Sequence, residues 1–297
     1  MKDTISRKIF NIFNIVIITL LCVIMVYPYL NQLAMAFNDS LDTSLGGLTV
    51  YPRVPTLTNF KTVLANSQVK SGLIISTTRT VFATLLALLV TYMAAYALAS
   101  RDFKGRKAIN LYLSIPMYLS AGTIPMFILY RYLGLINSYW VYILPGMFSF
   151  YNMLIIRSYL EGIPKEIEES SKIDGANEFL IMIKIMLPMS MPVVATIILW
   201  LAVGYWNDWM TTMYYITKPN LYTLQYVMMQ IIKQAEVTAK MAAEQMQGAV
   251  KTENQTVVTS ESVQAAVLII ATVPILVVYP FLQKYFVGGV TLGAVKG

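Results

Sequence analysis

The chain has 297 residues, of which 57% are hydrophobic and only 12% are charged, and its mean hydropathy is +0.61. Soluble domains carry about twice this share of charged residues, so lipid is the expected solvent. The absence of histidine removes His-based catalysis and the commonest metal ligand, and the single Cys22 excludes an internal disulfide. The net charge of +7 is assigned to basic loops of a membrane protein and not to nucleic-acid binding.

Six stretches free of Asp, Glu, Lys and Arg are long enough to cross a membrane as helices, at 9–38, 80–100, 108–130, 132–156, 185–207 and 262–283. Strands of a membrane barrel would be shorter and would alternate in polarity. The predicted fold class is therefore an all-α polytopic membrane protein with one transmembrane domain over residues 1–297. Its six spans are expected at about 9–36, 72–100, 108–130, 136–158, 186–209 and 262–283.

Basic residues gather before the first span and after the second, at Lys2, Arg7, Lys8, Arg101, Lys104, Arg106 and Lys107. The first span is too long for the core of a signal peptide and is expected to remain as an anchor. The positive-inside rule then places both chain termini and the segment 161–188 in the cytoplasm. Residues 38–70 and 213–261 are expected to face outward.

The stretch "EESSKIDGANEFLIMIKIMLP", residues 168–188, interrupts the apolar chain with charge. Pro164 and the acidic residues after it favour the start of a helix, and Gly175 favours its end. A second short helix is expected from "ANEFL", and Pro188 is expected to redirect the chain into span five. From composition alone, an ordinary cytoplasmic loop with a surface helix would also fit.

The same stretch resembles the EAA motif of ABC importer permeases, in which Glu-Ala-Ala, Gly, Ile and Leu-Pro recur at fixed spacing. The matching residues here are Glu169, Ser170, Ser171, Gly175, Ile185, Leu187 and Pro188. Every spacing agrees, and the one departure is Ser-Ser in place of Ala-Ala. The resemblance implies the ABC type I importer permease fold and makes 161–188 a coupling segment that docks in a cleft of a separate ATP-binding subunit. No phosphate-binding loop occurs in the sequence, so ATP and Mg²⁺ are expected on that partner and no cofactor on this chain.

The resemblance covers essentially the whole chain, including "MVYPYLNQLAMAFND", "YWND" and the ending "KYFVGGVTLGAVKG". These stretches look like the carbohydrate-uptake, maltose-permease-like branch that serves complex oligosaccharides. That branch implies a bacterial cell-membrane subunit that is not an enzyme. Its implied partners are a second, different permease, two ATP-binding subunits and an extracellular solute-binding protein.

Two further contacts follow from the resemblance. The C-terminal tail, with Gly293, Ala294 and Lys296, is expected to reach the ATP-binding subunits, although a frayed terminus is the plain alternative. The stretch 222–247 lacks Gly and Pro and is predicted to form an external amphipathic helix. By resemblance this helix meets the binding protein; a cap over the outer mouth is the alternative.

A sugar path needs hydrogen-bonding groups and aromatic faces. The end of span five offers Tyr205, Trp206, Asn207 and Asp208, although an interfacial aromatic belt would explain these aromatics equally well. Arg79 lies well inside span two, where an arginine is costly. It is expected to bind an acidic sugar such as a uronate, to snorkel to the outer interface, or to pair with a partner subunit.

The predicted function is therefore the permease subunit of an ATP-driven importer for oligosaccharides, with acidic ones included. The alternatives are a permease of the same type for an amino acid, a peptide or a polyol, and a self-sufficient secondary transporter. A secondary transporter needs ionisable relays inside its spans, and Arg79 is the only charge well inside an apolar stretch. A membrane enzyme would need a nucleophile, a metal or an acid pair, and the sequence has no histidine and no clustered carboxylates within its spans.

Overall fold

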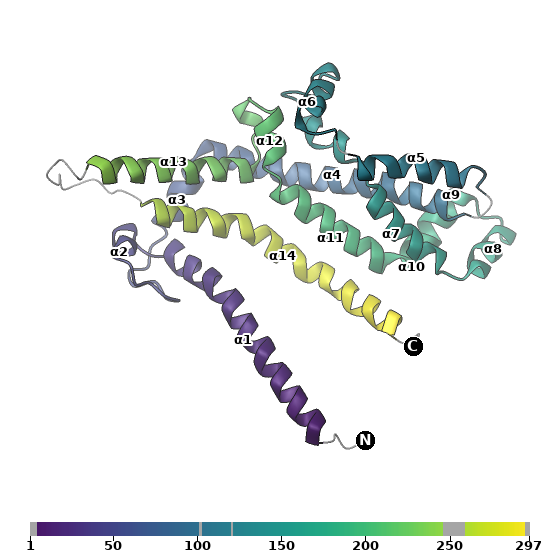
Figure 1. Cartoon of the computed structure of the whole chain (residues 1–297), viewed down its shortest axis with the longest axis horizontal. Helices are drawn as coiled ribbons and strands as arrows, with labels where there is room; N and C mark the ends of the chain where they lie inside the picture. The colour runs from purple at the N-terminus through teal and green to yellow at the C-terminus, as the bar shows by residue number, and fades with distance from the viewer. Residues whose placement is uncertain (1–4, 101–102, 120, 246–258, 295–297) are drawn as a thin grey trace. The chain divides into compact units, whose positions relative to one another are not determined.

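The computed structural model describes residues 5–100, 103–119, 121–245 and 259–294 (Figure 1). Over these residues the chain is almost entirely helical, and its one strand-like feature is an isolated bridge between Asn38 and Pro55. The predicted all-α class is thereby confirmed. The chain forms two compact units, residues 1–70 with 228–273, and residues 71–227 with 274–297.

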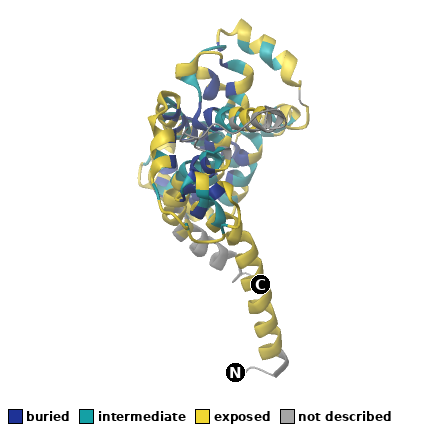
Figure 2. Ribbon diagram, turned by 90° about the vertical axis from the view of Figure 1, so that its left-hand side faces the viewer, coloured by how far each residue is buried: buried dark blue, intermediate teal, exposed yellow. Residues whose placement is uncertain are grey.

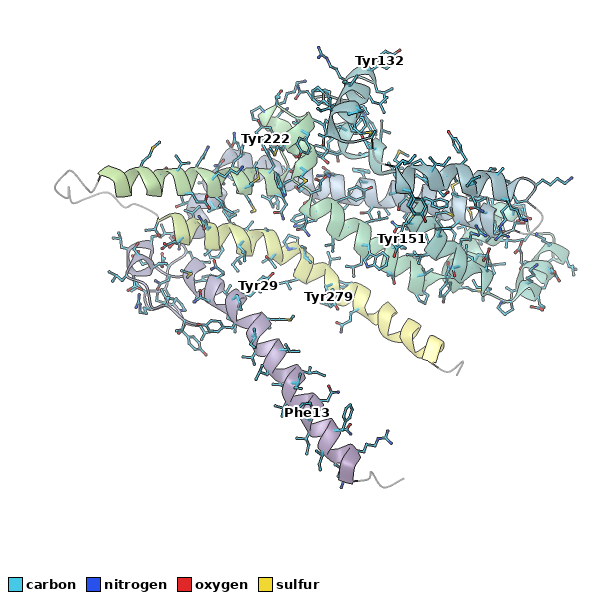
Figure 3. All side chains as sticks on the ribbon, in the orientation of Figure 1. Phe13, Tyr29, Tyr132, Tyr151, Tyr222 and Tyr279 are labelled. Carbon is cyan, nitrogen blue, oxygen red and sulfur yellow. The ribbon has the colours of Figure 1, made fainter. Side chains whose placement is uncertain are left out.

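The first unit contains α1 (Ile5–Ala36), α2 (Ser40–Ser44) and α3 (Thr58–Ala65), most of α13 (Leu224–Gln245) and the start of α14 (Ser260–Ala294). Helix α1 is exposed along nearly its whole described length, as its yellow colour in Figure 2 shows. Phe13 and Tyr29 project from it with 62% and 56% of their surface exposed (Figure 3). A helix that is apolar on every side and unburied by its own chain is suited to lipid or to a partner in the membrane.

A buried amide network organises the segment that follows α1. Asn38 and Asn59 are both fully buried, and Asn59 donates to the carbonyls of Ala36 and Asn38 at 3.0 and 2.8 Å. Asn38 in turn donates to Asp42 at 2.8 Å, and Arg53 donates to the same carboxylate. The Asn38 hydrogen bond, followed by the Arg53 guanidinium, lowers the pKa of Asp42. The segment is therefore a folded element and not a slack linker.

The second unit contains the remaining helices, which follow one another through the middle of the chain. They are α4 (Ser67–Ala99), α5 (Arg106–Tyr118), α6 (Thr123–Tyr132), η1 (Tyr139–Tyr142), η2 (Leu144–Gly146), α7 (Phe150–Glu161), α8 (Lys165–Ile173), α9 (Glu178–Ile181), η3 (Met182–Met186), α10 (Leu187–Met189), α11 (Met191–Asn207), α12 (Met210–Tyr215) and η4 (Pro219–Leu221). The C-terminal part of α14 belongs to the same unit.

Helix α4 is central to this unit because one stripe of it is buried. Gly72, Ser76, Arg79, Ala83 and Ala87 recur at helical spacing and are all buried. Small residues on one face let neighbouring helices approach closely, as is common in membrane helix packing. The stripe continues into a larger apolar core toward the C-terminal end of α4, which joins α4 to α7, α9, η3 and α11. Its buried members are Tyr92, Ala95, Leu98, Met153, Ile156, Leu160, Ile181, Met182, Met186, Val193, Val194 and Ile197.

Helix length and apolar composition show which described helices could cross a membrane. In the described ranges, three helices are long and apolar enough to cross a membrane, namely Arg7–Ala36, Ser67–Ala99 and Glu261–Phe281. The spans expected as single helices at 108–130, 136–158 and 186–209 are each two helical pieces, and counting each bent pair as one span gives up to six. Local chemistry accounts for two of the breaks. Gly122 has a φ of 81° before α6, and the Ser149 hydroxyl caps the start of α7.

Candidate functional site

The coupling segment, residues 161–188, folds as two short helices around a tight turn, as predicted. Helix α8 ends at Ile173, and Gly175 has a φ of 85°, which a residue with a side chain rarely adopts. The Asn177 side chain accepts a hydrogen bond from the Leu180 backbone N–H at 2.8 Å and so caps α9. The sequence pattern therefore located this turn to the residue.

The chain redirects slightly later than the sequence suggested. The bend of 84° lies between Met189 and Met191, at Ser190, and not at Pro188. Pro188 stands in the first turn of α10, where its missing N–H is tolerated, directly after the π-helical turn η3. The Ser190 hydroxyl donates to the Met186 carbonyl at 2.7 Å, which satisfies a backbone group at the break.

The residues expected to dock an ATP-binding subunit divide by exposure. Glu169, Ser170 and Pro188 are exposed, whereas Ile185 and Leu187 are half-buried and Ser171 is buried with its hydroxyl bonded to Ile167. Only Ser170 of the serine pair therefore presents its side chain outward.

Two apolar side chains that the motif does not include are also exposed on the coupling segment. Ile173 is 86% exposed and Phe179 is 65% exposed. Large apolar side chains on a charged segment are typical of a protein contact. A hydrophobicity scan of 168–188 for apolar residues outside the buried face of each short helix would have found them.

Exposed ion pairs hold the coupling segment together. Lys172 lies 2.9 Å from both Glu168 and Glu178, and these two carboxylates, Glu168 first, raise the pKa of Lys172. The Tyr96 hydroxyl of α4 donates to Glu178 at 2.9 Å. A cleft of about 790 Å³ lies between the coupling segment and the adjoining ends of α4, α5 and α7. The segment is thus tied to the helices by a few polar contacts beside an open space.

A second group of residues surrounds Arg79, and we name Arg79, Asp208, Tyr142 and Tyr205 the Arg79 cluster. The Arg79 side chain is only 2% exposed and forms a salt bridge with the Asp208 carboxylate. Its second nitrogen donates to the Asp208 backbone carbonyl at 2.9 Å. The guanidinium carbon lies 4.6 Å from the centre of the Tyr142 ring and 5.9 Å from that of Tyr205. The charge of Arg79 is therefore neutralised by Asp208 and covered by two tyrosine rings, all within the same chain.

The two tyrosines are fixed by hydrogen bonds of their own. Tyr142 donates to the Leu221 carbonyl at 2.8 Å, and Tyr205 donates to the Gly146 carbonyl at 2.8 Å. A Cβ atom at Gly146 would lie 2.5 Å from the Tyr205 hydroxyl oxygen, so this close approach requires glycine. The sequence did not reveal the roles of Tyr142 and Gly146, because neither is near Arg79 or Asp208 along the chain.

The structure brings Arg79, Tyr205 and Asp208 together, and it gives Trp206 and Asn207 different surroundings. Arg79 pairs with Asp208 of its own chain, which is neither the interfacial position nor the partner-subunit pair expected as alternatives to sugar binding. Trp206 is buried and lines an apolar cavity of about 170 Å³ with residues of α4 and α14. Asn207 is exposed and accepts a hydrogen bond from Gln225 at 3.4 Å.

The external helix and the tail were also predicted. Helix α13, Leu224–Gln245, confirms a helix over the described part of 222–247. Gly293 and Ala294 belong to the last turn of α14, and Lys296 lies outside the described residues. Among the residues that the structure covers, no group of three His, Cys, Asp or Glu side chains could hold a metal ion.

Several long apolar helices with a charged helix–turn–helix between them define a polytopic membrane protein. The chain belongs to the family described as the binding-protein-dependent transport system inner membrane component, which it matches over residues 74–291. Members of this family are the membrane permease components of ABC importers, a class of subunit that is not itself catalytic.

Individual relatives are similar over their whole length. Protein LplC of Bacillus subtilis (strain 168) is 35% identical over 297 residues, which are 100% of this chain and 98% of LplC. The polygalacturonan/rhamnogalacturonan transport system permease protein YtcP of the same organism is 31% identical over 98% of this chain and 100% of its own. A chain from the crystal structure of a bacterial ABC transporter involved in the import of the acidic polysaccharide alginate superposes with a TM-score of 0.83. It is 25% identical, over 96% of this chain and 99% of that one. The predicted family and the importer permease fold are confirmed.

Proposed function

We propose that this chain forms half of the translocation path of an ABC importer. It works with a second, different permease, two ATP-binding subunits and an extracellular solute-binding protein. ATP and Mg²⁺ bind to the partner subunits, and this chain binds no cofactor. The observation that carries the proposal is the coupling segment, where the motif spacing, the positive φ of Gly175 and the exposed Glu169 occur together in a chain of this family.

The proposed topology has six spans with both termini in the cytoplasm. Three continuous helices and three bent pairs support the number. Basic residues beside the first two spans support the orientation.

The coupling segment docks an ATP-binding subunit through its exposed side. Glu169 offers a charge to a basic residue of the partner, and Ser170 allows close approach. Ile173 and Phe179 supply apolar surface that their own chain leaves uncovered. Gly175 sets the angle between the two short helices, while Ile185, Leu187 and Pro188 connect the segment to α11.

Two other parts of the chain meet partners. Helix α13 contacts the binding protein outside the membrane. This role is supported by its length of 22 residues, by its placement between spans and by the exposed Val237 and Met241. The tail with Gly293, Ala294 and Lys296 reaches toward the ATP-binding subunits.

The transported solute is an oligosaccharide, and acidic oligosaccharides are the class that we favour. YtcP is described as a polygalacturonan/rhamnogalacturonan permease and the solved transporter as an alginate importer, and both names concern acidic polysaccharides. Asn207 and the partly exposed edge of Asp208 offer hydrogen-bonding groups to sugar hydroxyls at the end of α11. Arg79, Tyr205 and Trp206 support the residues that face the path here and do not face it themselves. Arg79 and Trp206 are buried, and the Tyr205 hydroxyl donates to the Gly146 carbonyl.

The coupling role is tested with Glu169→Lys combined with Gly175→Pro in the complex reconstituted in liposomes. We expect ATP-dependent uptake and substrate-stimulated ATP hydrolysis to fall to background, because the docking charge and the turn are both lost. Lys61→Glu, a charge reversal on the exposed face of α3, is the control and should transport normally. Uptake and stimulated hydrolysis at the wild-type rate in the double variant would refute the assignment.

The substrate class is tested by uptake of radiolabelled oligogalacturonides and maltooligosaccharides of equal length. ATP-dependent uptake of the acidic series in preference to the neutral one is the expected result. Uptake of the neutral series alone, or of neither series, would reject acidic oligosaccharides as the substrate class.

A further inference from the structure

Helix α4 is a continuous helix of 33 residues and contains no proline. At 1.5 Å per residue its length is about 50 Å, which is enough to cross a bilayer with its interfacial regions. A helix without a kink moves as a stiff body, so a displacement at one end reaches the other end. Both groups of residues described above contact this helix.

Near its N-terminal end, α4 holds the first turn of α13. The Ser76 hydroxyl accepts a hydrogen bond from the Leu224 backbone N–H at 2.8 Å, and both residues are buried. A Cβ atom at Gly72 would lie 3.1 Å from the Leu224 Cα, so the two backbones are in close contact here. One turn further along α4, Arg79 binds Asp208, which precedes α12.

The Arg79 cluster extends this attachment through buried hydroxyl groups. Tyr142, which lies against Arg79, shares a hydrogen bond of 2.9 Å with Thr212 of α12. Thr212 shares another, of 2.8 Å, with Thr223 at the base of α13. Tyr142, Thr212 and Thr223 are all buried and their hydroxyl groups are hydrogen-bonded, so α4, α12 and the base of α13 are held in one arrangement.

Toward its C-terminal end, α4 bonds the coupling segment and the break that follows it. Tyr96 donates to Glu178 at 2.9 Å, and the hydroxyls of Tyr92 and Ser190 lie 2.9 Å apart. Arg79 and Tyr96 are separated by about 25 Å along the helix at its ordinary rise. One rigid element thus carries specific polar contacts to the base of α13 and to the coupling segment.

We propose that α4 transmits binding-protein engagement from α13 to the coupling segment, with Ser76 and Arg79 as positioning residues at one end and Tyr96 at the other. This inference rests on the proposed function for the partners of α13 and of the coupling segment. Arg79 suits the task because its planar fork binds a backbone carbonyl and a carboxylate at once. Lysine has a single ammonium nitrogen in place of the two guanidinium nitrogens that make these contacts, so the charge alone does not reproduce their geometry.

The test uses the full reconstituted complex and measures ATP hydrolysis without and with the solute-binding protein and its sugar. The variants are Ser76→Ala, Arg79→Lys and Tyr96→Phe. Each should lower the stimulation by about fivefold or more, the lower range of coupling between two sites. Hydrolysis without binding protein should stay at the wild-type rate in Ser76→Ala and Tyr96→Phe, since neither residue is in the predicted docking surface.

Matched controls use side chains of similar chemistry without such contacts between helices. Thr78→Val removes an α4 hydroxyl that bonds its own helix at Ile74, and Tyr112→Phe changes a tyrosine that is 74% exposed. In both control variants the binding protein and its sugar should stimulate ATP hydrolysis as strongly as in the wild type. A wild-type complex without ATP-dependent uptake would refute the proposed function itself, which this assay separates from the role of α4.

A double variant tests whether the contacts at the two ends of α4 depend on each other. Because Ser76 and Tyr96 act in series, Ser76→Ala with Tyr96→Phe should lose no more stimulation than the stronger single variant. Losses that multiply would show two independent effects and would overturn the proposal. Wild-type stimulation in all three single variants, or an equal fall of stimulated and unstimulated hydrolysis, would overturn it as well.

Discussion

The Arg79 cluster and the coupling segment both rely on charge, but they use it in opposite settings. The Arg79 side chain is 2% exposed and its ion pair is enclosed by two tyrosine rings. The Lys172 side chain is 44% exposed, and its two glutamates lie beside an open cleft. An ion pair whose guanidinium is buried fixes one arrangement, because breaking it leaves that guanidinium without a counter-charge and without water. Exposed pairs are weak and are easily exchanged for contacts with a partner.

This difference matches the roles proposed for the two regions. In the proposed mechanism the rigid region holds the base of α13 to α4, and the adjustable region meets an ATP-binding subunit that changes shape. Four substitutions test the contrast, and their expected effects on stability decrease in the order given.

The largest effect is expected from Arg79→Ala, which leaves the Asp208 carboxylate without its partner. Removing one member of a buried pair costs about 3–5 kcal/mol, and the loss is expected at the lower end because Asp208 is partly exposed and keeps two hydrogen bonds from Thr211. Thermal unfolding of the purified protein in detergent measures the loss. Arg79→Met with Asp208→Leu, which removes both charges, should recover most of the stability. A single variant as stable as the wild type would contradict the enclosed ion pair.

The packing behind the Arg79 cluster is tested by Gly146→Ala. The added methyl group would displace the Tyr205 ring and break its hydrogen bond, with an expected cost of about 1–3 kcal/mol. Gly204→Ala is the control, since nothing lies within 4 Å of a Cβ atom there and alanine favours the helix. Equal unfolding temperatures for the two variants would exclude the close contact.

The turn of the coupling segment is tested by Gly175→Ala. The Cβ atom would meet open space, so the cost arises only from the backbone and is about 1–2 kcal/mol. Asparagine tolerates this backbone conformation better, so Gly175→Asn should lose less. If the alanine variant were the more stable of the two, the left-handed turn would be wrong.

The smallest effect is expected from Lys172→Gln, which removes the exposed bridge. The change in unfolding free energy should stay within about 1 kcal/mol at neutral pH. The pKa of Lys172 is raised in the folded state, so its stabilisation is complete below the unfolded value of about 10.4 and is lost as pH rises through the folded value. The unfolding free energies of the wild type and of Lys172→Gln should therefore become equal only in strong alkali. A difference that vanished near neutral pH would contradict the bridge.

The sequence predicted local features better than contacts between distant segments. Gly175, the helix before it and the extent of α1 follow from residue types and spacing within a few turns. The pairing of Arg79 with Asp208 joins residues 129 positions apart, and no local pattern encodes it. The buried spacing of Gly72, Ser76 and Ala83 around Arg79 was a visible sign that this face packs against protein and not lipid.

The breaks inside the expected spans were missed because a search for uncharged stretches does not register turns. Gly122 and Ser149 are uncharged, yet each starts a new helix. The bend after the coupling segment lies two residues beyond the predicted Pro188, because the Ser190 hydroxyl bonds the Met186 carbonyl at the break.

The most direct test of the proposed coupling role is to detect contact between the coupling segment and an ATP-binding subunit. Cys22→Ser removes the only cysteine, and Ser170→Cys then carries a benzophenone maleimide for photo-cross-linking in the assembled complex. Thr62→Cys on α3 is the matched exposed position. We expect position 170 to cross-link to the ATP-binding subunit and position 62 not to do so. No cross-link from position 170 in a complex that transports substrate would contradict the account.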